Sequence, residues 1–138
     1  MVGHVYTMTP EDCWDLLRRR EFGRLAYHDS RRVQIVPVNF AVDQHRIIFR
    51  TAEGSKFSSV MENADVAFET DELTDEAAMS VIARGLAYEL TGDEALMSDQ
   101  LRLRPWIKDA KNHVVAVDIS EISGRFFYLS KPWTHMMR

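Results

Sequence analysis

The hydrophobic pattern of the chain is mostly that of short β-strands. Runs rich in β-branched and aromatic residues are separated by turn residues and short polar stretches. The first three runs, 24–29, 33–42 and 47–51, are joined by the tight turns "SRR" and "DQHR". We therefore expect an antiparallel meander there. Further runs cover 65–71, 79–90 and 113–129, the last as two pieces around Gly124, which makes about seven strands.

Two or three stretches have helical spacing instead. In "TPEDCWDLLRRREFG", Thr9 is a suitable N-cap, Pro10 suits the first helical position, and Gly23 is expected to end the helix. A short helix is predicted from about Ser55, and an amphipathic one over residues 93–103. The segments 72–78 and 104–112 are predicted to be loops.

This order of elements predicts a mainly β protein. No GxGxxG motif follows a strand and the βαβ alternation is missing, which disfavours a doubly wound nucleotide fold. Antiparallel strands in this number usually close into a barrel or a sandwich. Gly85, inside a long run, is expected to mark a bulge or a close backbone approach. We expect one domain over residues 1–138.

Composition and charge exclude several classes. The chain has 138 residues, 46% of them hydrophobic and 28% charged, as in ordinary folded proteins. Its net charge of −4 disfavours nucleic acid as a partner. No apolar run reaches the roughly 20 residues of a membrane span, and the N-terminus does not resemble a secretory signal. With one cysteine, Cys13, and scattered histidines, we expect a cytoplasmic protein without a metal site.

One segment, "IIFRTAEGSKF", concentrates groups that bind anions. Arg50 and Thr51 end a predicted strand, and Ser55 and Lys56 begin a predicted helix. Helix N-termini, guanidinium and ammonium groups all favour phosphate. A capped helix start with both cations in solvent explains the same residues, and "GSK" lacks the GxxxxGK spacing of a Walker loop. The spacing alone leaves both interpretations open.

Pro37 lies in the middle of the run "IVPVNF" and raises a second question. Proline removes a donor from a β-ladder, so it is normally confined to edges and bulges. It is either a simple edge-strand proline or a break whose free backbone groups bind a flat, polar ligand.

The order of the short motifs resembles the pyridoxamine 5′-phosphate oxidase-like superfamily. The motifs are "DCWDLL", "GRLAY", "IVPVNFAVD", "IIFRTAEGSK", "ADVAFETDE", "MSVIARGLA", "RPW" and "SGRFF", and they run from about Thr9 to Phe127. Each is weak by itself, whereas their order and spacing are specific. The resemblance implies an FMN-binding split β-barrel that forms a homodimer, with two flavin sites at the dimer interface.

The resemblance also implies a cofactor and its binding residues. The cofactor is FMN or, in an alternative branch, a deazaflavin coenzyme. Val36, Pro37 and Val38 would run along the ring and offer backbone hydrogen bonds. The remaining implied residues are Arg50, Thr51, Ser55 and Lys56 at the phosphate end, Ser80 facing the cofactor from the next strand, and Trp106 over the partner subunit's site.

Two departures limit what the resemblance implies. True pyridoxamine phosphate oxidases end in an Arg- and His-containing substrate segment, and this chain ends "FFYLSKPWTHMMR" instead. Some nitroreductase-like relatives carry a His where this chain has Arg50. We therefore expect a flavin- or deazaflavin-dependent oxidoreductase acting on a small organic acceptor, without a catalytic side chain and without the vitamin-B6 reaction. The alternative is a non-catalytic flavin- or haem-binding carrier or sensor.

Overall fold

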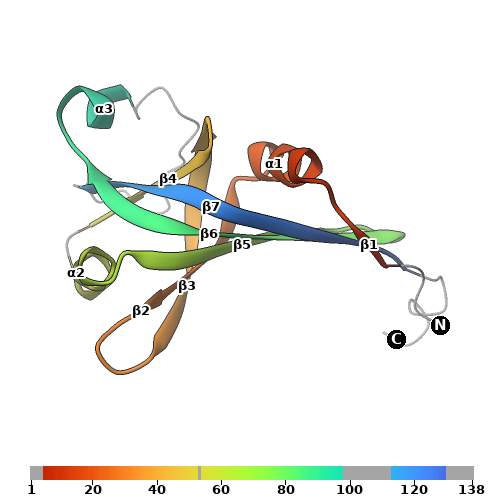
Figure 1. Ribbon diagram of the computed structural model, residues 1–138, viewed down its shortest axis with the longest axis horizontal. Coiled ribbons are helices and arrows are strands. Elements are labelled where there is room, and N and C mark those ends of the chain that lie inside the picture. Colours follow the sequence, from red (N-terminus) through yellow and green to blue (C-terminus); the bar gives the residue numbers. More distant parts are fainter. Residues whose placement is uncertain (1–4, 53, 98–112, 130–138) are drawn as a thin grey trace.

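The computed structural model describes residues 5–52, 54–97 and 113–129, and within these ranges the chain forms seven strands and three helices (Figure 1). The helices are α1 (Pro10–Arg19), α2 (Ser55–Glu62) and α3 (Gly92–Met97). The strands are β1 (Val5–Thr7), β2 (Phe22–His28), β3 (Val33–Asp43), β4 (Arg46–Thr51), β5 (Asp65–Leu73), β6 (Ala77–Leu90) and β7 (His113–Tyr128).

All seven strands belong to one antiparallel sheet that closes on itself. The strand order is β1-β7-β4-β3-β2-β5-β6, and β6 pairs with β7 as well, so six strands form a ring. Strand β1 pairs with the far end of β7, outside this ring. The predicted meander is confirmed, since β2, β3 and β4 are consecutive neighbours. The architecture is the split antiparallel barrel that the family resemblance implies.

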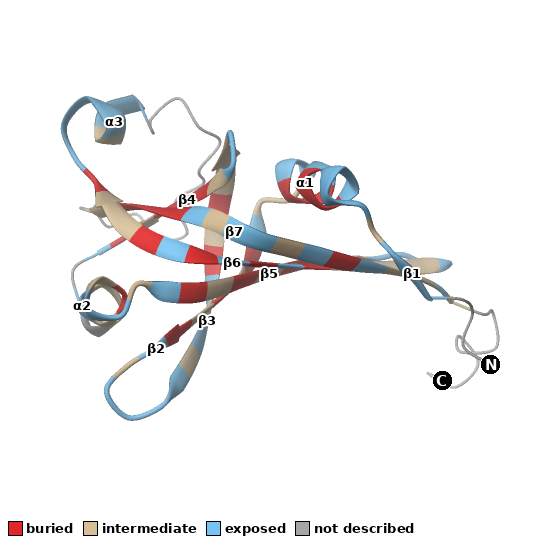
Figure 2. Cartoon of the chain, viewed as in Figure 1, coloured by how far each residue is buried: buried red, intermediate tan, exposed pale blue. Residues whose placement is uncertain are grey.

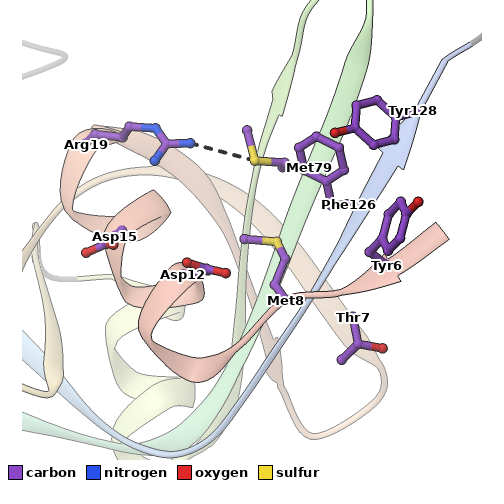
Figure 3. A pocket seen from close by; sticks show the side chains of 9 residues that line it. All are labelled: Tyr6, Thr7, Met8, Asp12, Asp15, Arg19, Met79, Phe126 and Tyr128. Atoms are coloured by element: carbon purple, nitrogen blue, oxygen red, sulfur yellow. Dashed lines mark hydrogen bonds between the residues drawn. The ribbon is translucent and has the colours of Figure 1, made fainter. Parts of the chain in front are cut away.

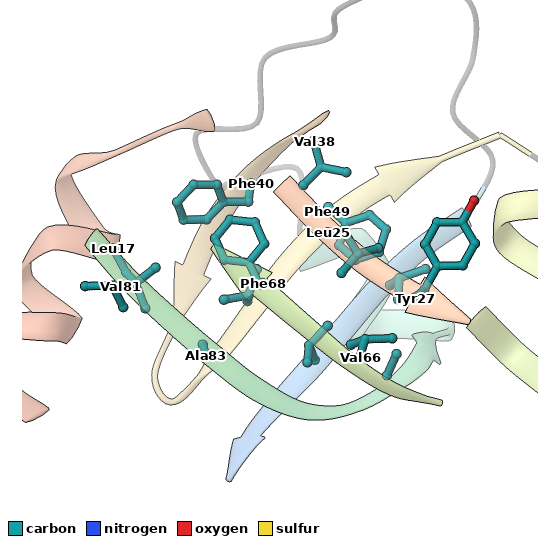
Figure 4. Close-up of a cluster of buried hydrophobic side chains, with 14 of the residues drawn as sticks. Leu17, Leu25, Tyr27, Val38, Phe40, Phe49, Val66, Phe68, Val81 and Ala83 are labelled. Atoms are coloured by element: carbon teal, nitrogen blue, oxygen red, sulfur yellow. The ribbon is translucent and has the colours of Figure 1, made fainter. Parts of the chain in front are cut away.

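Alternation along each strand fills the barrel with apolar side chains. Phe40 and Phe68 meet edge to face with ring centroids 4.6 Å apart, and both are fully buried (Figure 4). Leu25, Val81 and Val115 point inward from three other strands. Each such side chain contributes about 1.5–3 kcal/mol on burial. Figure 2 shows the resulting alternation of buried and exposed residues along the strands.

Helix α1 packs on the sheet with one face. Its buried residues are Cys13, Trp14, Leu16 and Leu17, at helical spacing, and the helix contacts β3, β6 and β7. Thr9 caps its N-terminus, because the Thr9 hydroxyl accepts a hydrogen bond from the Asp12 backbone N–H at 3.1 Å. This confirms the predicted start of the helix.

Several predicted boundaries were wrong. Gly23 does not end the first helix: α1 ends at Arg19, and Gly23 is buried in β2. Most of the expected loop 72–78 is strand, since β5 reaches Leu73 and β6 begins at Ala77. The last strand is continuous through Gly124, and the short β1 was not predicted. Of the helix expected over 93–103, α3 supplies residues up to Met97, and the rest lies outside the described residues.

Gly85 behaves as predicted. The pairing of β6 with β7 shifts register between Arg84 and Gly85, so that Ser120 is an extra residue in β7. A Cβ atom on Gly85 would lie 1.8 Å from the carbonyl oxygen of Asp118. Only glycine permits this approach of the two backbones.

Candidate functional site

Strands β3 and β4 separate at Asn39 and Arg50. Their ladder runs from the turn to the pair Phe40–Phe49, and continued register would next pair Asn39 with Arg50. That pair is missing from the described ladder. Beyond it β3 keeps only its other neighbour, β2, while β4 pairs with β7 to Thr51 and then leads into α2. The barrel is therefore open along one edge of β3.

The direction of the backbone groups shows what this edge offers. Phe40 donates its N–H to the Glu21 carbonyl oxygen, at 2.9 Å, on the β2 side. Because successive residues of a strand point their backbone groups to opposite edges, those of Ile35, Pro37 and Asn39 face the open side. Pro37 thus sits where a strand residue needs no ladder donor. β3 is not broken at Pro37, and its free edge carries the carbonyl groups that a ligand could use.

The connection from β4 to α2 follows the point where β4 leaves β3. Arg50 is half-buried on the outer face of β4, and Thr51 is buried, with its hydroxyl donating to the Ala52 carbonyl at 3.2 Å. Helix α2 begins at Ser55, followed by a half-buried Lys56. Gly54 occupies the N-cap, and among the described residues no side chain caps this helix. The backbone N–H groups of its first turn are thereby left for water or an anion.

The backbone conformation at position 54 does not require a glycine. Its φ of 161° is extended backbone, and a Cβ atom there would meet nothing within 4 Å. What glycine changes is the chemistry of the N-cap, because it brings no oxygen that could accept hydrogen bonds from the helix.

A histidine that the sequence did not single out lies at the same end of the barrel. His113 begins β7 opposite Thr51, and its ring stacks on Phe57 of α2 with centroids 3.9 Å apart. Its Nδ1 lies 2.6 Å from a carboxylate oxygen of Glu89. Only the register of β7 brings these residues together, so spacing along the chain could not reveal them.

The other residues predicted to bind the cofactor do not lie together at the open edge of β3. Val36 and Val38 direct their side chains into the core, and by alternation their backbone groups face β2. Ser80 lies in β6 between Asp71 and Arg125, and two strands, β2 and β5, separate it from β3. Within one chain it is therefore not on the strand next to the open edge. Trp106 lies outside the described residues.

Beside the open edge, the outer face of the sheet carries an ion cluster. Arg24 is the β2 partner of Pro37, and its guanidinium donates to Glu69 and to Asp71, each at 2.8 Å. Burial raises the pKa of Glu69, while the hydrogen bond from Arg24 acts in the opposite direction. The cluster is flanked by exposed apolar residues, with Ile35 66% and Ile82 41% exposed.

The described residues lack two other features, a metal-binding cluster and a membrane-spanning helix. They contain no group of three or more His, Cys, Asp or Glu side chains that could hold a metal ion. No helix among them is long and apolar enough to cross a membrane.

Known proteins are similar to this chain in sequence. The family model described as pyridoxamine 5′-phosphate oxidase matches residues 9–126. The uncharacterized protein Rv0080 of Mycobacterium tuberculosis is 32% identical over 127 residues, which cover 87% of this chain and 84% of that protein.

Two solved structures are similar throughout. One is a Corynebacterium glutamicum protein provisionally assigned as a pyridoxamine 5′-phosphate oxidase, with 36% identity and a TM-score of 0.82, covering 94% of this chain and 98% of that one. The other is an FAD-binding protein of Mycobacterium smegmatis, with 34% identity and a TM-score of 0.77, covering 89% and 98%.

Proposed function

This chain belongs to the pyridoxamine 5′-phosphate oxidase family, and we propose that it is a flavin-dependent oxidoreductase acting on a small organic acceptor. The observation that carries the proposal is the separation of β3 and β4 at Asn39 and Arg50. It leaves one edge of β3 without a strand partner among the described residues. From this point β4 leads past Arg50 to the start of α2, which carries Lys56. A flat polar ring with a phosphate end matches both features, and the Mycobacterium smegmatis relative is itself an FAD-binding protein.

The chain's own residues would hold the cofactor at two ends. The backbone groups of Ile35, Pro37 and Asn39 would bind the polar edge of the ring. Arg50, Lys56 and the first N–H groups of α2 would bind the phosphate, because guanidinium, ammonium and helix dipole all favour it. This cluster is suited to one phosphate group, which favours FMN. A bound flavin supplies the electron transfer itself, so no side chain has to act as a nucleophile or a base.

The proposed assembly is a homodimer that covers the open edge. On the outer face, Val33 and Ile35 are 63% and 66% exposed, and both lie on the strand that carries Pro37. Apolar residues this exposed on one strand favour a partner surface. A second copy placed there would exclude water from a ring lying along β3, and Ser80 of the partner could then approach it. Sites at the interface would explain why a single chain does not unite Ser80 with the others.

The assembly is tested by light scattering. We expect the wild-type protein to be a dimer at micromolar concentration and Ile35→Glu to be a monomer, because the substitution buries a charge in the interface. Leu96→Glu is the matched control, since Leu96 is equally exposed, at 67%, but lies on α3. A monomeric wild-type protein would contradict the interface and remove half of each proposed site.

The cofactor is tested by the visible absorption spectrum of the purified protein, before and after denaturation, and by titration with FMN, FAD and a deazaflavin. We expect FMN to bind, and Arg50→Ala with Lys56→Ala to weaken it by about 100-fold or more, since two charge-assisted contacts are lost. The control is Arg31→Ala with Arg32→Ala, which removes the same charge from two exposed residues of the β2–β3 turn. Equal binding by both double variants would refute the phosphate site.

Turnover is tested separately. With FMN bound, the flavin should be reduced anaerobically by a nicotinamide donor and reoxidised by a small organic acceptor. A flavin that binds but is never reduced, by nicotinamide or deazaflavin donors, would favour the carrier function over the oxidoreductase.

A further inference from the structure

A second concave site lies at the other end of the molecule, in a pocket of about 460 Å³. Its walls come from β1, α1 and the far ends of β6 and β7, and no residue of β3, β4 or α2 contributes to it. The volume is within the roughly 300–1,000 Å³ typical of small-molecule sites. The lining residues are Tyr6, Thr7, Met8, Asp12, Asp15, Arg19, Met79, Phe126 and Tyr128 (Figure 3).

Close packing at Gly124 brings the segment that carries Met8, one of the lining residues, against β7. Met8 donates its backbone N–H to the Gly124 carbonyl at 2.9 Å, which ties the chain before α1 to β7. A Cβ atom on Gly124 would lie 2.8 Å from the Cys13 sulfur and 2.9 Å from the Met8 sulfur. Because glycine lets both sulfurs approach the sheet, α1 lies close to β7 and the pocket forms between its polar side and the end of the sheet.

One wall is aromatic. The rings of Tyr6 and Tyr128 meet at 88° with centroids 5.8 Å apart, and those of Phe126 and Tyr128 at 73° and 4.8 Å. Tyr128 is 52% exposed, so part of its ring surface remains available to a ligand. Edge-to-face pairs hold these rings in fixed orientations. Met8 and Met79 lie between this wall and α1 in Figure 3 and add polarizable, adaptable surface.

The opposite wall, formed by α1, is acidic in effect. Arg19 contributes a guanidinium, but this group is already bound to both oxygens of Glu72, at 3.2 and 3.4 Å. The same contact lowers the pKa of Glu72 and keeps it charged. Asp15 is paired with Arg18 at 3.1 Å in an exposed bridge, which is weak. The Asp12 carboxylate has no cationic partner among the described residues.

We propose that this pocket is a second ligand site, which binds a small organic cation: an ammonium group carried on an aromatic or other apolar body. The faces of the tyrosine and phenylalanine rings attract a cation through their quadrupoles. Asp12 supplies a carboxylate for the ammonium group, and the methionines contact the apolar body. An anionic ligand would meet Asp12 and Asp15, while Arg19, the one cation among the described lining residues, is already held by Glu72, which also pairs with Arg20 at 3.7 Å.

The test uses the full-length protein and 2-phenylethylamine as the probe, with 2-phenylethanol as its neutral counterpart. Calorimetry should give a Kd of about 1 mM or tighter for the amine, reasonable for a ligand of this size, and about 10-fold weaker binding for the alcohol. Spectra of the protein labelled at its methionine methyl groups should show the Met8 and Met79 signals shifting with the amine.

Two variants localise the charge effect. Asp12→Asn should weaken amine binding by about 10-fold, and Tyr128→Leu should weaken it further in combination. Glu11→Gln is the matched control, because Glu11 lies in the same helical turn and makes the same change in charge without lining the pocket. Unchanged melting temperatures would show that the variants are folded.

The outcomes separate this site from the proposed flavin site. Lys56→Ala should leave amine binding unchanged, so loss of flavin binding does not affect the result. The proposal is overturned if the amine does not bind, if it binds no better than the alcohol, if Asp12→Asn and Glu11→Gln behave alike, or if other methionine signals shift instead.

Discussion

The two longer helices of this chain begin in opposite ways. At α1, the Thr9 hydroxyl accepts the Asp12 N–H, and Glu11 and Asp12 place negative charge in the first turn. At α2, the N-cap is Gly54, the first turn has no acidic residue, and Lys56 adds positive charge. The first helix satisfies its own terminus. The second leaves its donors and its dipole uncompensated by the described side chains, and this difference supports the proposed anion at α2.

The largest effect on FMN binding is expected from giving α2 an N-cap side chain that accepts hydrogen bonds, as Thr9 does at α1. Gly54→Asp should weaken FMN binding by about 100-fold, since its carboxylate accepts the N–H groups that the phosphate needs and repels it. The same variant without cofactor should be a few tenths of a kcal/mol more stable than wild type, because a carboxylate caps a helix slightly better than glycine. Titration and urea unfolding measure the two effects.

Gly54→Ala and Gly54→Ser make this prediction specific. Alanine adds no acceptor and meets nothing within 4 Å, so FMN affinity should stay within about two-fold of wild type. Serine adds an acceptor without charge and should fall between alanine and aspartate. If all three variants bind FMN equally well, no anion lies at the start of α2.

The reverse change at α1 should affect stability alone. Thr9→Ala removes the cap and should lower the free energy of unfolding by about 1 kcal/mol, while FMN affinity stays constant. Thr9→Ser keeps a hydroxyl at the cap and should restore most of the loss. A drop in FMN affinity for Thr9→Ala would mean that the two ends of the molecule are coupled, and that the comparison does not separate a structural terminus from a binding one.

Local signals in the sequence predicted the local parts of this fold. The Thr9 cap and Pro10 located the start of α1, and the turns around Asp29 and Gln44 located the β2–β3–β4 meander. Gly124 misled the prediction of β7, because a glycine that looks like a break is needed for the approach of Cys13 and Met8. The three residues of β1 are too short to show a period.

The residues of the candidate site also differ in whether local sequence could predict them. Arg50, Thr51, Ser55 and Lys56 lie within seven residues, so their proximity could be predicted, and Pro37 correctly marked an edge. Ile35 and Asn39 follow only from the direction of the β3 ladder, and the contact between His113 and Glu89 only from the register of β7. The pocket at Asp12 joins residues 6 to 128 and has no signature in the sequence.

The β2–β3 turn extends the comparison to a third set of backbone donors and gives the smallest expected effect. Asp29 accepts hydrogen bonds from the backbone N–H groups of Arg31 and Arg32, at 2.8 and 2.9 Å, and from the Gln34 amide at 2.7 Å. The Gln34 contact and then the two backbone contacts lower the pKa of Asp29 to about 2. Like Thr9, and unlike Gly54, this residue satisfies its donors from within the chain.

A folded-state pKa below the ordinary value of about 3.9 means that the carboxylate stabilises the native state at higher pH. Its contribution is complete above about pH 4 and is lost as the pH falls towards 2. Asp29→Asn should therefore flatten the decline of the urea midpoint between about pH 4 and pH 2. Asp65→Asn, at an exposed residue of β5, should not. Equal slopes for wild type and Asp29→Asn would show that the turn does not depend on the charge. Val33 follows this turn directly, so the rigidity of the turn also sets where the strand that carries Pro37 begins. A looser turn in Asp29→Asn should slightly weaken FMN binding without changing the salt dependence of that binding.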